Sequence, residues 1–487
     1  MLDLYALRSG STRGKVATPV GRRWESEDMR LSPNHTNWVV VAGLMLACVV
    51  AFADGTRFSD ITPLTNSVGP AADESTPITF GNSDFRQASI ADRAAQLFAL
   101  KPNSGSWDMI TSNETGPEKG RYLFTVFETE QSGVQRHDLL TGETDTIWYS
   151  PALEDHVSFD PSFWTPWGTL IVGEESWCTD VAGCTSPYGR LFEFKNPVVA
   201  PAIFEPIGPN SNDGAVFVHQ NVVPRTSHEG IQFDRDGNMY FIDELSGGNI
   251  YKYTSAASFA SVKNGTADYF AAGQTFVLRV GNGSVANATG AYTWVPITNP
   301  NGVALPGAIT ITDSNGVTSV DARNTTNLPT FKGTDYQRPE DMQIQTAGGV
   351  DYLYVTTTTT NETYRLNLKK NTISVFADRL TIDLATGAAV GTSLANVDNL
   401  AIDHDGNIYI VEDFAGGEGD DIWVAKDLNG DGNLTDPGEG LARWASNGTL
   451  GSEFTGLYFD PFNKRRAWVN IQHPDSNNDR TIEITIP

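Results

Sequence analysis

Carboxylate and histidine side chains recur directly before short apolar segments that are typical of β-strands. The groups are Asp155-His156, His228-Glu229-Gly230, Arg338-Pro339-Glu340-Asp341, Asp398-Asn399 and Glu453-Phe454-Thr455. Carboxylates that are brought together repel one another unless a cation joins them. Oxygen ligands favour Ca²⁺ or Mg²⁺, and several carboxylates with a histidine also suit iron or manganese. If the fold gathers these groups, they predict a metal centre; the alternative is a channel closed by water and hydrogen bonds.

A repeated hairpin supplies the spacing that would gather them. Residues 233–244 and 402–413 each place a D-x-D-G-N turn between two apolar strands, with Gly where the turn needs a positive φ. Weaker copies lie at 120–128, 165–175, 349–357 and 466–472, and a further strand follows at 190–194, 249–253, 363–366 and 421–424. Six copies predict an all-β, six-bladed β-propeller over residues 54–487, with a β-sandwich or β-helix as alternatives.

Propeller geometry turns this repeat into a prediction about the site. Equivalent positions in successive blades are related by rotation about a central channel, so the start of each innermost strand should face that channel. Residues 265–335 interrupt the repeat and are rich in Gly, Asn and Thr, which predicts a long loop insertion.

A second candidate metal site begins at Asp427. Oxygen-bearing side chains occupy positions 427, 429, 431 and 433, namely Asp427, Asn429, Asp431 and Asn433, and Gly432 allows a sharp turn. This spacing is that of the first part of an EF-hand-type calcium loop. The twelfth position is Gly438 and not Glu, so the last ligand is displaced or missing; the alternative is a polar turn without metal.

The N-terminal residues 1–53 predict a targeting signal and not a part of the fold. Residues 38–53 form one apolar run that ends in Ala51-Phe52-Ala53, an A-x-A cleavage pattern. A start at Met29 would give a conventional signal peptide and leave residues 1–28 as an upstream extension. We therefore expect a secreted or periplasmic protein; a lipid anchor at Cys48 and an uncleaved membrane anchor are the alternatives.

The formal net charge of -26 argues against partners that are nucleic acids or anionic lipids. No P-loop, G-x-S-x-G, H-E-x-x-H or Rossmann glycine pattern occurs in the sequence. After cleavage only Cys178 and Cys184 would remain, and they could close a small loop in an oxidising compartment. We expect a monomer.

Several short motifs together resemble the PhoX-type alkaline phosphatases. They are Thr165-Pro166-Trp167-Gly168-Thr169 with Glu174-Glu175, His228-Glu229-Gly230, Arg338-Pro339-Glu340-Asp341, Asp398-Asn399-Leu400 and Asn470-Ile471-Gln472-His473-Pro474. They follow the family's order over about residues 100–475. The resemblance implies a six-bladed propeller with an iron–calcium cluster in its channel, which hydrolyses small phosphomonoesters outside the cytoplasm.

The resemblance also implies a role for single residues. Glu229 and Glu340 would bind iron, and Arg338 would bind the substrate phosphate, since a forked donor suits it. The residues implied as calcium ligands are Glu174 or Glu175, Asp341 and Asp398, and His473 would lie at the edge of the site.

One departure from the family pattern concerns iron. Gly173 stands where the family has an iron-binding Cys before the paired Glu residues. The resemblance therefore implies calcium and leaves iron open: the cluster could be calcium-only, lack iron or recruit another group. Two further functions stay open, namely a non-catalytic, calcium-stabilised propeller that binds a partner or surface polymer, and a calcium-dependent lactonase-type hydrolase.

Overall fold

A computed structural model describes residues 56–487 except 72, 177–185, 200–206, 212–213 and 414–419. The chain divides into residues 1–54 and 55–487, and only the second unit contains described residues. The predictions for residues 1–53, including Cys48, and for Cys178 and Cys184 lie outside the described part. Among the residues that are described, no helix has both the length and the hydropathy to cross a membrane.

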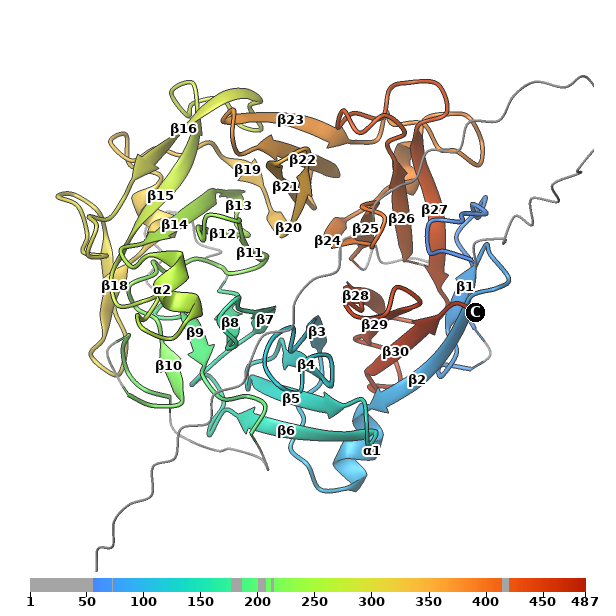
Figure 1. Cartoon of the computed structure of the whole chain (residues 1–487), viewed down its shortest axis with the longest axis horizontal. Helices are drawn as coiled ribbons and strands as arrows, with labels where there is room; N and C mark the ends of the chain where they lie inside the picture. The colour runs from blue at the N-terminus through green and yellow to red at the C-terminus, as the bar shows by residue number, and fades with distance from the viewer. Residues whose placement is uncertain (1–55, 72, 177–185, 200–206, 212–213, 414–419) are drawn as a thin grey trace, which may run out of the picture. The chain divides into compact units, whose positions relative to one another are not determined.

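Antiparallel sheets build nearly all of this unit and are arranged around a centre (Figure 1). The first sheet has the order β3 (Trp107–Ser112), β4 (Tyr122–Phe127), β5 (Gly133–Asp138) and β6 (Glu143–Tyr149). The next has the order β7 (Phe159–Trp164), β8 (Leu170–Glu174), β9 (Leu191–Phe194) and β10 (Phe217–His219). Each therefore follows the chain from the innermost strand outward, as in a propeller blade.

Two further groups of four strands merge into one nine-stranded sheet. One group is β11 (Ile231–Phe233), β12 (Met239–Ile242), β14 (Ile250–Ser255) and β15 (Gly273–Val280); the other is β20 (Pro339–Ala347), β21 (Val350–Thr357), β22 (Glu362–Asn367) and β23 (Thr372–Ala377). Strand β16 (Gly290–Pro296) pairs with both β15 and β23 and so joins them. The arrangement of the sheets is propeller-like. Because this join merges two groups of strands into one sheet, the number of blades stays a prediction.

The N-terminal strands of the unit complete the last two sheets. Strand β1 (Ile78–Phe80) pairs with β27 of the sheet β24 (Val397–Ile402), β25 (Ile408–Glu412), β26 (Asp421–Lys426) and β27 (Gly440–Asn447). Strand β2 (Arg86–Asp92) pairs with β30 of the sheet β28 (Glu453–Phe459), β29 (Arg466–Gln472) and β30 (Arg480–Thr485). The pairing of β2 with β30 covers an edge that would otherwise be open and ties the two ends of the unit together.

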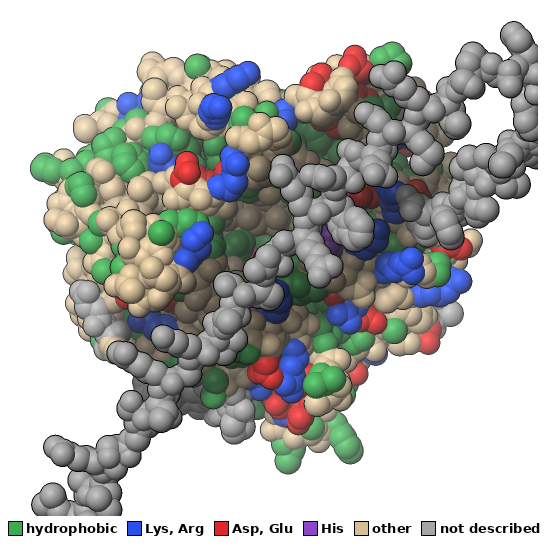
Figure 2. Space-filling model, viewed as in Figure 1, with side chains coloured by type: hydrophobic (Ala, Val, Ile, Leu, Met, Phe, Trp, Pro, Cys, Tyr) green, Lys and Arg blue, Asp and Glu red, His purple; other side chains and the backbone are tan. Residues whose placement is uncertain are grey.

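The smaller elements lie in the connections between these strands. They are α1 (Arg93–Phe98), α2 (Phe259–Lys263), α3 (Ala322–Thr325), the 3₁₀ turn η1 (Gly391–Ser393), the pair β13 (Ser246–Gly248) and β19 (Tyr336–Gln337), and the pair β17 (Thr310–Thr312) and β18 (Thr318–Val320). On the face drawn in Figure 2, Lys and Arg side chains lie among Asp and Glu where described residues cover it.

The prediction that residues 265–335 form a long loop insertion is wrong in two respects: the segment contains strands, and its first part belongs to a sheet. The segment contains β15, the outer strand of the group that begins with β11, as well as β16, β17, β18 and α3. Val277 and Ile297 are fully buried and pack into the same core cluster as Val320 and Phe331. The high content of Gly, Asn and Thr hid these strands, because it reflects the turns between them and not the buried positions.

Six innermost strands contact one another in a closed cycle: β3, β7, β11, β20, β24 and β28. In five of them the pairing with the second strand is irregular, directly after the first residue in β3, β7, β20 and β24 and after the third residue in β28. The two residues that break the register are Asp108-Met109, Asp160-Pro161, Glu340-Asp341, Asp398-Asn399 and Gly456-Leu457. A β-bulge redirects side chains locally. The repeated bulge therefore turns an acidic residue out of the regular pleat in four of these strands.

Gly456 shows how closely the innermost strands approach at this level. Its φ is +60°, its amide donates to Asn399 Oδ1 at 2.7 Å, and a Cβ would lie 2.7 Å from Ile110 N. A side chain there would therefore meet the backbone of β3.

We predict that Gly456→Ala lowers the free energy of unfolding by about 3 kcal/mol or more, since backbone strain and a backbone clash add. Gly348→Ala is the matched control, because Gly348 also has a positive φ of +56° but has open space around it. We expect about 1 kcal/mol for the control. Urea unfolding of both variants measures the difference; equal losses would contradict the close approach of β28 and β3.

Candidate metal centre

The first layer of the centre consists of carboxylates on the innermost strands or, for Glu229, two residues before the strand. Its members are Asp108, Asp160, Glu229, Glu340 and Asp398. All but Asp398 are buried, and Asp398 is half-buried. The residue two positions earlier has a positive φ in four cases, at Ser106, Ser158, Arg338 and Asn396. In these four cases the strand therefore begins with the same sharp change of direction, and the carboxylate follows at a fixed offset.

The residues of the second layer come directly after, or two residues after, the second strand of each group of strands. Its members are Glu128, Glu175, Glu244, Thr358 and Asp413. The amide of each donates to the carbonyl oxygen of the residue two positions before a first-layer carboxylate: Ser106 at 2.9 Å, Ser158 at 2.7 Å, Ser227 at 3.0 Å, Arg338 at 3.0 Å and Asn396 at 2.8 Å, respectively. Backbone hydrogen bonds thus fix the two layers against each other in five groups of strands, namely those that begin with β3, β7, β11, β20 and β24.

Two sets of three carboxylates converge closely enough to hold cations. One set is Asp108, Glu128 and Asp160, and the other is Glu229, Glu244 and Glu340; within each set one oxygen of every carboxylate lies within 4.8 Å of the others. Each set combines both layers. The prediction that Glu229 and Glu340 share a site is consistent with their placement in the second set.

Burial and mutual repulsion oppose ionisation of these groups. The pKa of Asp108 and the pKa of Glu229 are raised well above their ordinary values, first by burial and then by the charge of Asp160. Burial also raises the pKa of Asp398, with repulsion from Glu340 as the next cause. A cation would relieve this repulsion.

Unpartnered oxygens in the centre fit a cation. Asp108 Oδ1, Asp160 Oδ1 and Glu229 Oε2 are buried and have no hydrogen-bond partner in the structure. A buried acceptor without a partner is costly, so such atoms call for a ligand, a proton or water. The donor set is made of carboxylate oxygens, which suits Ca²⁺.

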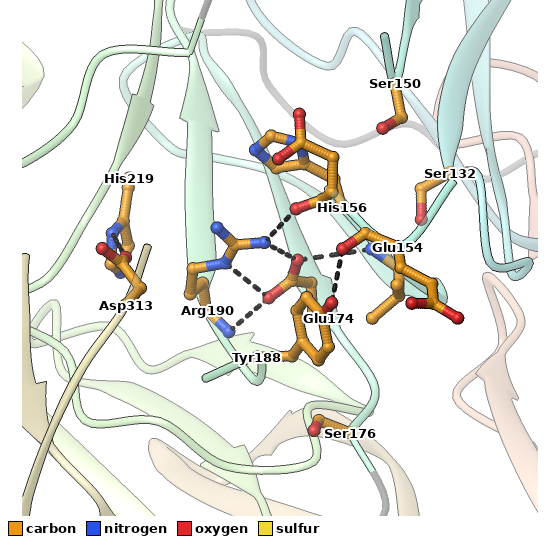
Figure 3. Close-up of polar contacts among 12 residues, drawn as sticks. Ser132, Ser150, Glu154, His156, Glu174, Ser176, Tyr188, Arg190, His219 and Asp313 are labelled. Carbon is orange, nitrogen blue, oxygen red and sulfur yellow. Dashed lines mark hydrogen bonds and ion pairs between the residues drawn. The ribbon is translucent and has the colours of Figure 1, made fainter. Parts of the chain in front are cut away.

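Glu174 and Glu175 are neighbours with different surroundings. The fully buried Glu174 carboxylate accepts from Arg190, with Nε at 2.8 Å and Nη2 at 2.5 Å (Figure 3). Glu175 instead lies close enough to Glu128 and Glu244 to raise the pKa of each, after burial as the larger cause. Glu175 therefore belongs to the acidic centre, whereas Glu174 is held in an ion pair.

Asp341 also has a structural partner for each oxygen. Oδ1 accepts from Met342 N at 2.6 Å, and Oδ2 accepts from Leu400 N of β24 at 2.9 Å. Asn399 makes the equivalent bond from β24 to Gly456 of β28. The second residue of each of these bulges thus binds the next innermost strand, and we leave Asp341 out of the proposed ligand set.

Arg338 lies beside the second carboxylate set. Its Nε and Nη2 donate to Glu244 Oε1 at 2.9 and 2.5 Å, and its Nε lies 3.3 Å from Glu340 Oε1. The side chain is 26% exposed, unlike the carboxylates that it contacts. Arg338 therefore presents a cation where the buried set meets solvent.

His473 lies at the edge of the first set. Its Nε2 is 4.0 Å from Glu128 Oε2 and 3.5 Å from Glu453 Oε1, and its Nδ1 is 3.2 Å from Ser106 Oγ. The side chain is 49% exposed. Its role at the edge of an active site stays a prediction.

Gly173 lies on β8 directly against the neighbouring sheet. A Cβ at Gly173 would lie 2.7 Å from His228 Cβ and 3.0 Å from Pro161 Cγ. A cysteine could enter this position only if these neighbours moved. His228 does not replace the missing thiolate as a member of either carboxylate set, and its ring packs against Phe241 at 5.5 Å.

The loop from Asp427 joins β26 to β27 and lies outside both carboxylate sets. The two oxygens of Asp427 accept from Gly430 N at 2.8 Å and Gly432 N at 2.9 Å. Asn429, Asp431 and Asn433 each accept from the amide two residues later, and buried Glu439 folds back to accept from Leu428 N at 2.9 Å. The loop has the turns of a calcium loop, and a calcium ion there stays a prediction.

Five acidic residues of the centre were not predicted from the sequence: Asp108, Glu128, Asp160, Glu244 and Asp413. In the sheet that begins with β7, Asp160 stands at the position that the sequence assigned to Asp155-His156. A signal for two of them was present, because Ser106-Trp107-Asp108 and Ser158-Phe159-Asp160 match the pattern of Asn396-Val397-Asp398. Glu128, Glu244 and Asp413 come after the second strands of hairpins that the sequence did identify.

We predict opposite effects for the two neighbouring glutamates. Glu174→Gln should destabilise the fold by about 3 kcal/mol or more, because it leaves the buried Arg190 without its partner charge, and it should keep metal binding. Glu175→Gln should weaken Ca²⁺ binding about tenfold with little loss of stability in the metal-free form, since it removes a repulsive charge. Thermal unfolding with and without Ca²⁺ separates the two; loss of Ca²⁺ binding in Glu174→Gln alone would reverse the assignment.

Known proteins resemble this chain both in sequence and in fold. The family model of alkaline phosphatase PhoX matches residues 164–475. The structure is similar to Pseudomonas fluorescens PhoX in complex with vanadate, a transition state analogue, with 15% identity, a TM-score of 0.57, and coverage of 86% of this chain and 97% of that one. At that identity the likeness shows the fold. No curated protein sequence matches the chain.

Two more distant structures have TM-scores below 0.5, which do not establish a common fold. One is a Bacteroides thetaiotaomicron protein of unknown function, with 10% identity, a TM-score of 0.36, and coverage of 86% of this chain and 75% of that one. The other is the calcium-binding protein regucalcin from Agrobacterium tumefaciens, with 12% identity, a TM-score of 0.35, and coverage of 78% and 90%. The family model, in contrast, covers more than half of the sequence, and the chain belongs to the alkaline phosphatase PhoX family.

Proposed function

We propose that the chain is a metal-dependent phosphomonoesterase whose active centre is formed by the two carboxylate sets and Arg338. The observation that supports this most directly is the placement of Arg338, a partly exposed guanidinium beside a set of three buried carboxylates. Carboxylates and one arginine around a common point are what a phosphate ester and its cations require. The family assignment supports the same activity and favours it over a lactonase.

The residues present fit calcium better than iron. Asp108, Glu128 and Asp160 would hold one cation, and Glu229, Glu244 and Glu340 another, all through oxygen. Gly173 removes the thiolate that iron would prefer, although carboxylates alone also bind iron. The bound cations would supply positive charge that polarises the phosphoryl group and offsets the charge that develops on its oxygens.

Arg338 would bind the phosphate of the substrate. Its guanidinium is always charged and offers donors in a planar fork, which matches two phosphate oxygens. In the structure this fork is directed at Glu244 and Glu340. When those carboxylates engage cations, their charge is compensated, and Arg338 can turn its donors to the substrate.

Neighbouring side chains would hold the ligands in place. Thr358 Oγ1 donates to Glu340, and Gln472 Nε2 donates to Glu128 Oε2 at 2.6 Å. These bonds orient one carboxylate of each set. His473 lies on the solvent side of Glu128, where it would exchange a proton with the leaving group or with water.

The substrate would be small and phosphorylated. We also propose that the enzyme is exported, which relies on the apolar segment of residues 38–53. We propose that it is a monomer. The acidic chain would repel a phosphate ester at long range, so bound cations and Arg338 must provide the local attraction.

We predict that Arg338→Ala lowers kcat/KM for p-nitrophenyl phosphate about 100-fold, the usual loss when one preorganised donor to the transition state is removed. Arg235→Ala is the control, because Arg235 is also paired with a carboxylate, Asp351 at 2.7 Å, but lies in the turn at the far end of its sheet. The control should keep its activity. An unchanged rate in Arg338→Ala would remove Arg338 from the mechanism.

We predict that chelation abolishes the turnover of p-nitrophenyl phosphate and that added Ca²⁺ restores it. Elemental analysis of the purified, active protein should find calcium, and iron only if another group replaces the thiolate that Gly173 lacks. Folded, calcium-loaded protein with no turnover under any metal would instead support the non-catalytic, calcium-stabilised propeller.

A further inference from the structure

A second cavity lies away from the carboxylate sets, between the outer parts of two sheets. Its volume is about 450 Å³, which is within the range of small-molecule sites. The lining comprises Trp148 and Tyr149 at the end of β6, Phe192 of β9, His219 at the end of β10, and Ser150, Pro151, Asp155, His156 and Arg190 from the connections. Strands β6 and β10 end, and β9 begins, on the face where β3 and β7 begin, because neighbouring strands alternate in direction. The cavity is therefore on the same face as the carboxylates, about 14 Å further out if three strand spacings of about 4.8 Å separate them.

Two buried histidines line this cavity, and each has one ring nitrogen without a hydrogen-bond partner. His156 and His219 are 7% and 3% exposed, and His156 Nδ1 and His219 Nε2 have no hydrogen-bond partner in the structure. The nearest carboxylate oxygens, on Asp155 and Asp313, are 3.7 and 3.8 Å from the respective Nδ1 atoms, too far for a hydrogen bond. Figure 3 shows the two rings on either side of Arg190. A buried polar atom without a partner is costly, which points to a ligand that supplies the missing bonds.

Both histidines are neutral in this setting. Burial lowers the pKa of His156 to about 4, with the nearby Arg190 as the next cause. Burial and then the charge of Arg225 lower the pKa of His219 well below its ordinary value. A neutral imidazole offers one donor and one acceptor.

The charged groups around the cavity are already paired. Arg190 is bound by Glu174, and Arg225 lies 3.1 Å from Asp313, so neither guanidinium brings an uncompensated charge. The remaining carboxylate is Asp155, whose side chain is 41% exposed. An anion would find no net attraction here. A metal ion is disfavoured too, since neither histidine belongs to a group of three close ligands among the described residues.

We propose that this cavity binds a neutral, polyhydroxylated ring, that is, a sugar residue. Each hydroxyl both donates and accepts, which matches two neutral imidazoles and the amides of Gln131 and Asn315 on the lining. The C–H face of the ring would lie against the apolar part of the lining, which includes Phe192, Pro151 and Pro209. This site is separate from the phosphatase centre and does not depend on it.

The test is a titration of the purified full chain with a panel of methyl glycosides, of glucose, galactose, mannose and N-acetylglucosamine, followed by saturation-transfer NMR and calorimetry. We expect saturable binding of at least one of them. His156→Gln and His219→Gln should each weaken it about tenfold, the effect of losing one hydrogen bond to a ligand. His137→Gln is the matched control, because His137 is also a buried histidine but lies beside Thr144, away from the cavity. It should bind as the unmodified protein does.

Further experiments distinguish a sugar from other ligands of this cavity. If neither glutamine variant folds, Asn315→Ala on the exposed rim takes their place. Arg338→Ala should leave glycoside binding unchanged, which keeps this result distinct from the fate of the phosphatase proposal. The proposal is overturned if no glycoside binds and the cavity holds water only, if inorganic phosphate or Zn²⁺ binds there in a histidine-dependent way, or if glycoside binding is unaffected by all the cavity variants.

Discussion

Repulsion among buried carboxylates is the constraint around which this structure is organised. Closing the innermost strands into a cycle brings acidic residues from several sheets toward one region, where burial and like charges raise their pKa values. Such a group is stable only with protons, with opposite charges or with cations. The structure uses the second means for Glu174, through Arg190, and in part for Glu244 and Glu340, through Arg338. It leaves Asp108, Asp160 and Glu229 with unpartnered oxygens, which is where cations are needed most.

The backbone determines which carboxylates meet. A bulge in the innermost strand and a bond from the end of the second strand recur from sheet to sheet, so the same two positions are aimed at the centre each time. The second bulge residue has a different task, since Asp341 and Asn399 each bind the amide of the next strand. Of two adjacent acidic residues such as Glu340 and Asp341, the first therefore faces the centre as a candidate ligand, and the second binds the backbone of the next strand. The pairing of β2 with β30 completes the last sheet at its outer edge, and the contact of β28 with β3 closes the cycle of innermost strands.

Much of this could be predicted from the sequence. The hairpin repeat predicted the strand pairs, and the motifs with Glu229, Arg338 and Glu340 predicted the centre of the second carboxylate set. The sequence could not tell Glu174 from Glu175, because Arg190, the partner of Glu174, lies directly before the following strand and is known only from the structure. It also missed Asp108 and Asp160, since Trp107 and Phe159 before them made these positions look like ordinary strand residues. The prediction of a loop at 265–335 was wrong because the many turn residues of this segment masked the buried positions of β15.

The central claim is that the two carboxylate sets bind cations, and anomalous diffraction from a crystal of the protein grown with Ca²⁺ tests it most directly. Data collected on both sides of the iron absorption edge would also identify the metal. The account predicts one anomalous peak among Asp108, Glu128 and Asp160 and another among Glu229, Glu244 and Glu340. Ordered water in both sets, with the carboxylates hydrogen-bonded to one another and no anomalous peak, would contradict it.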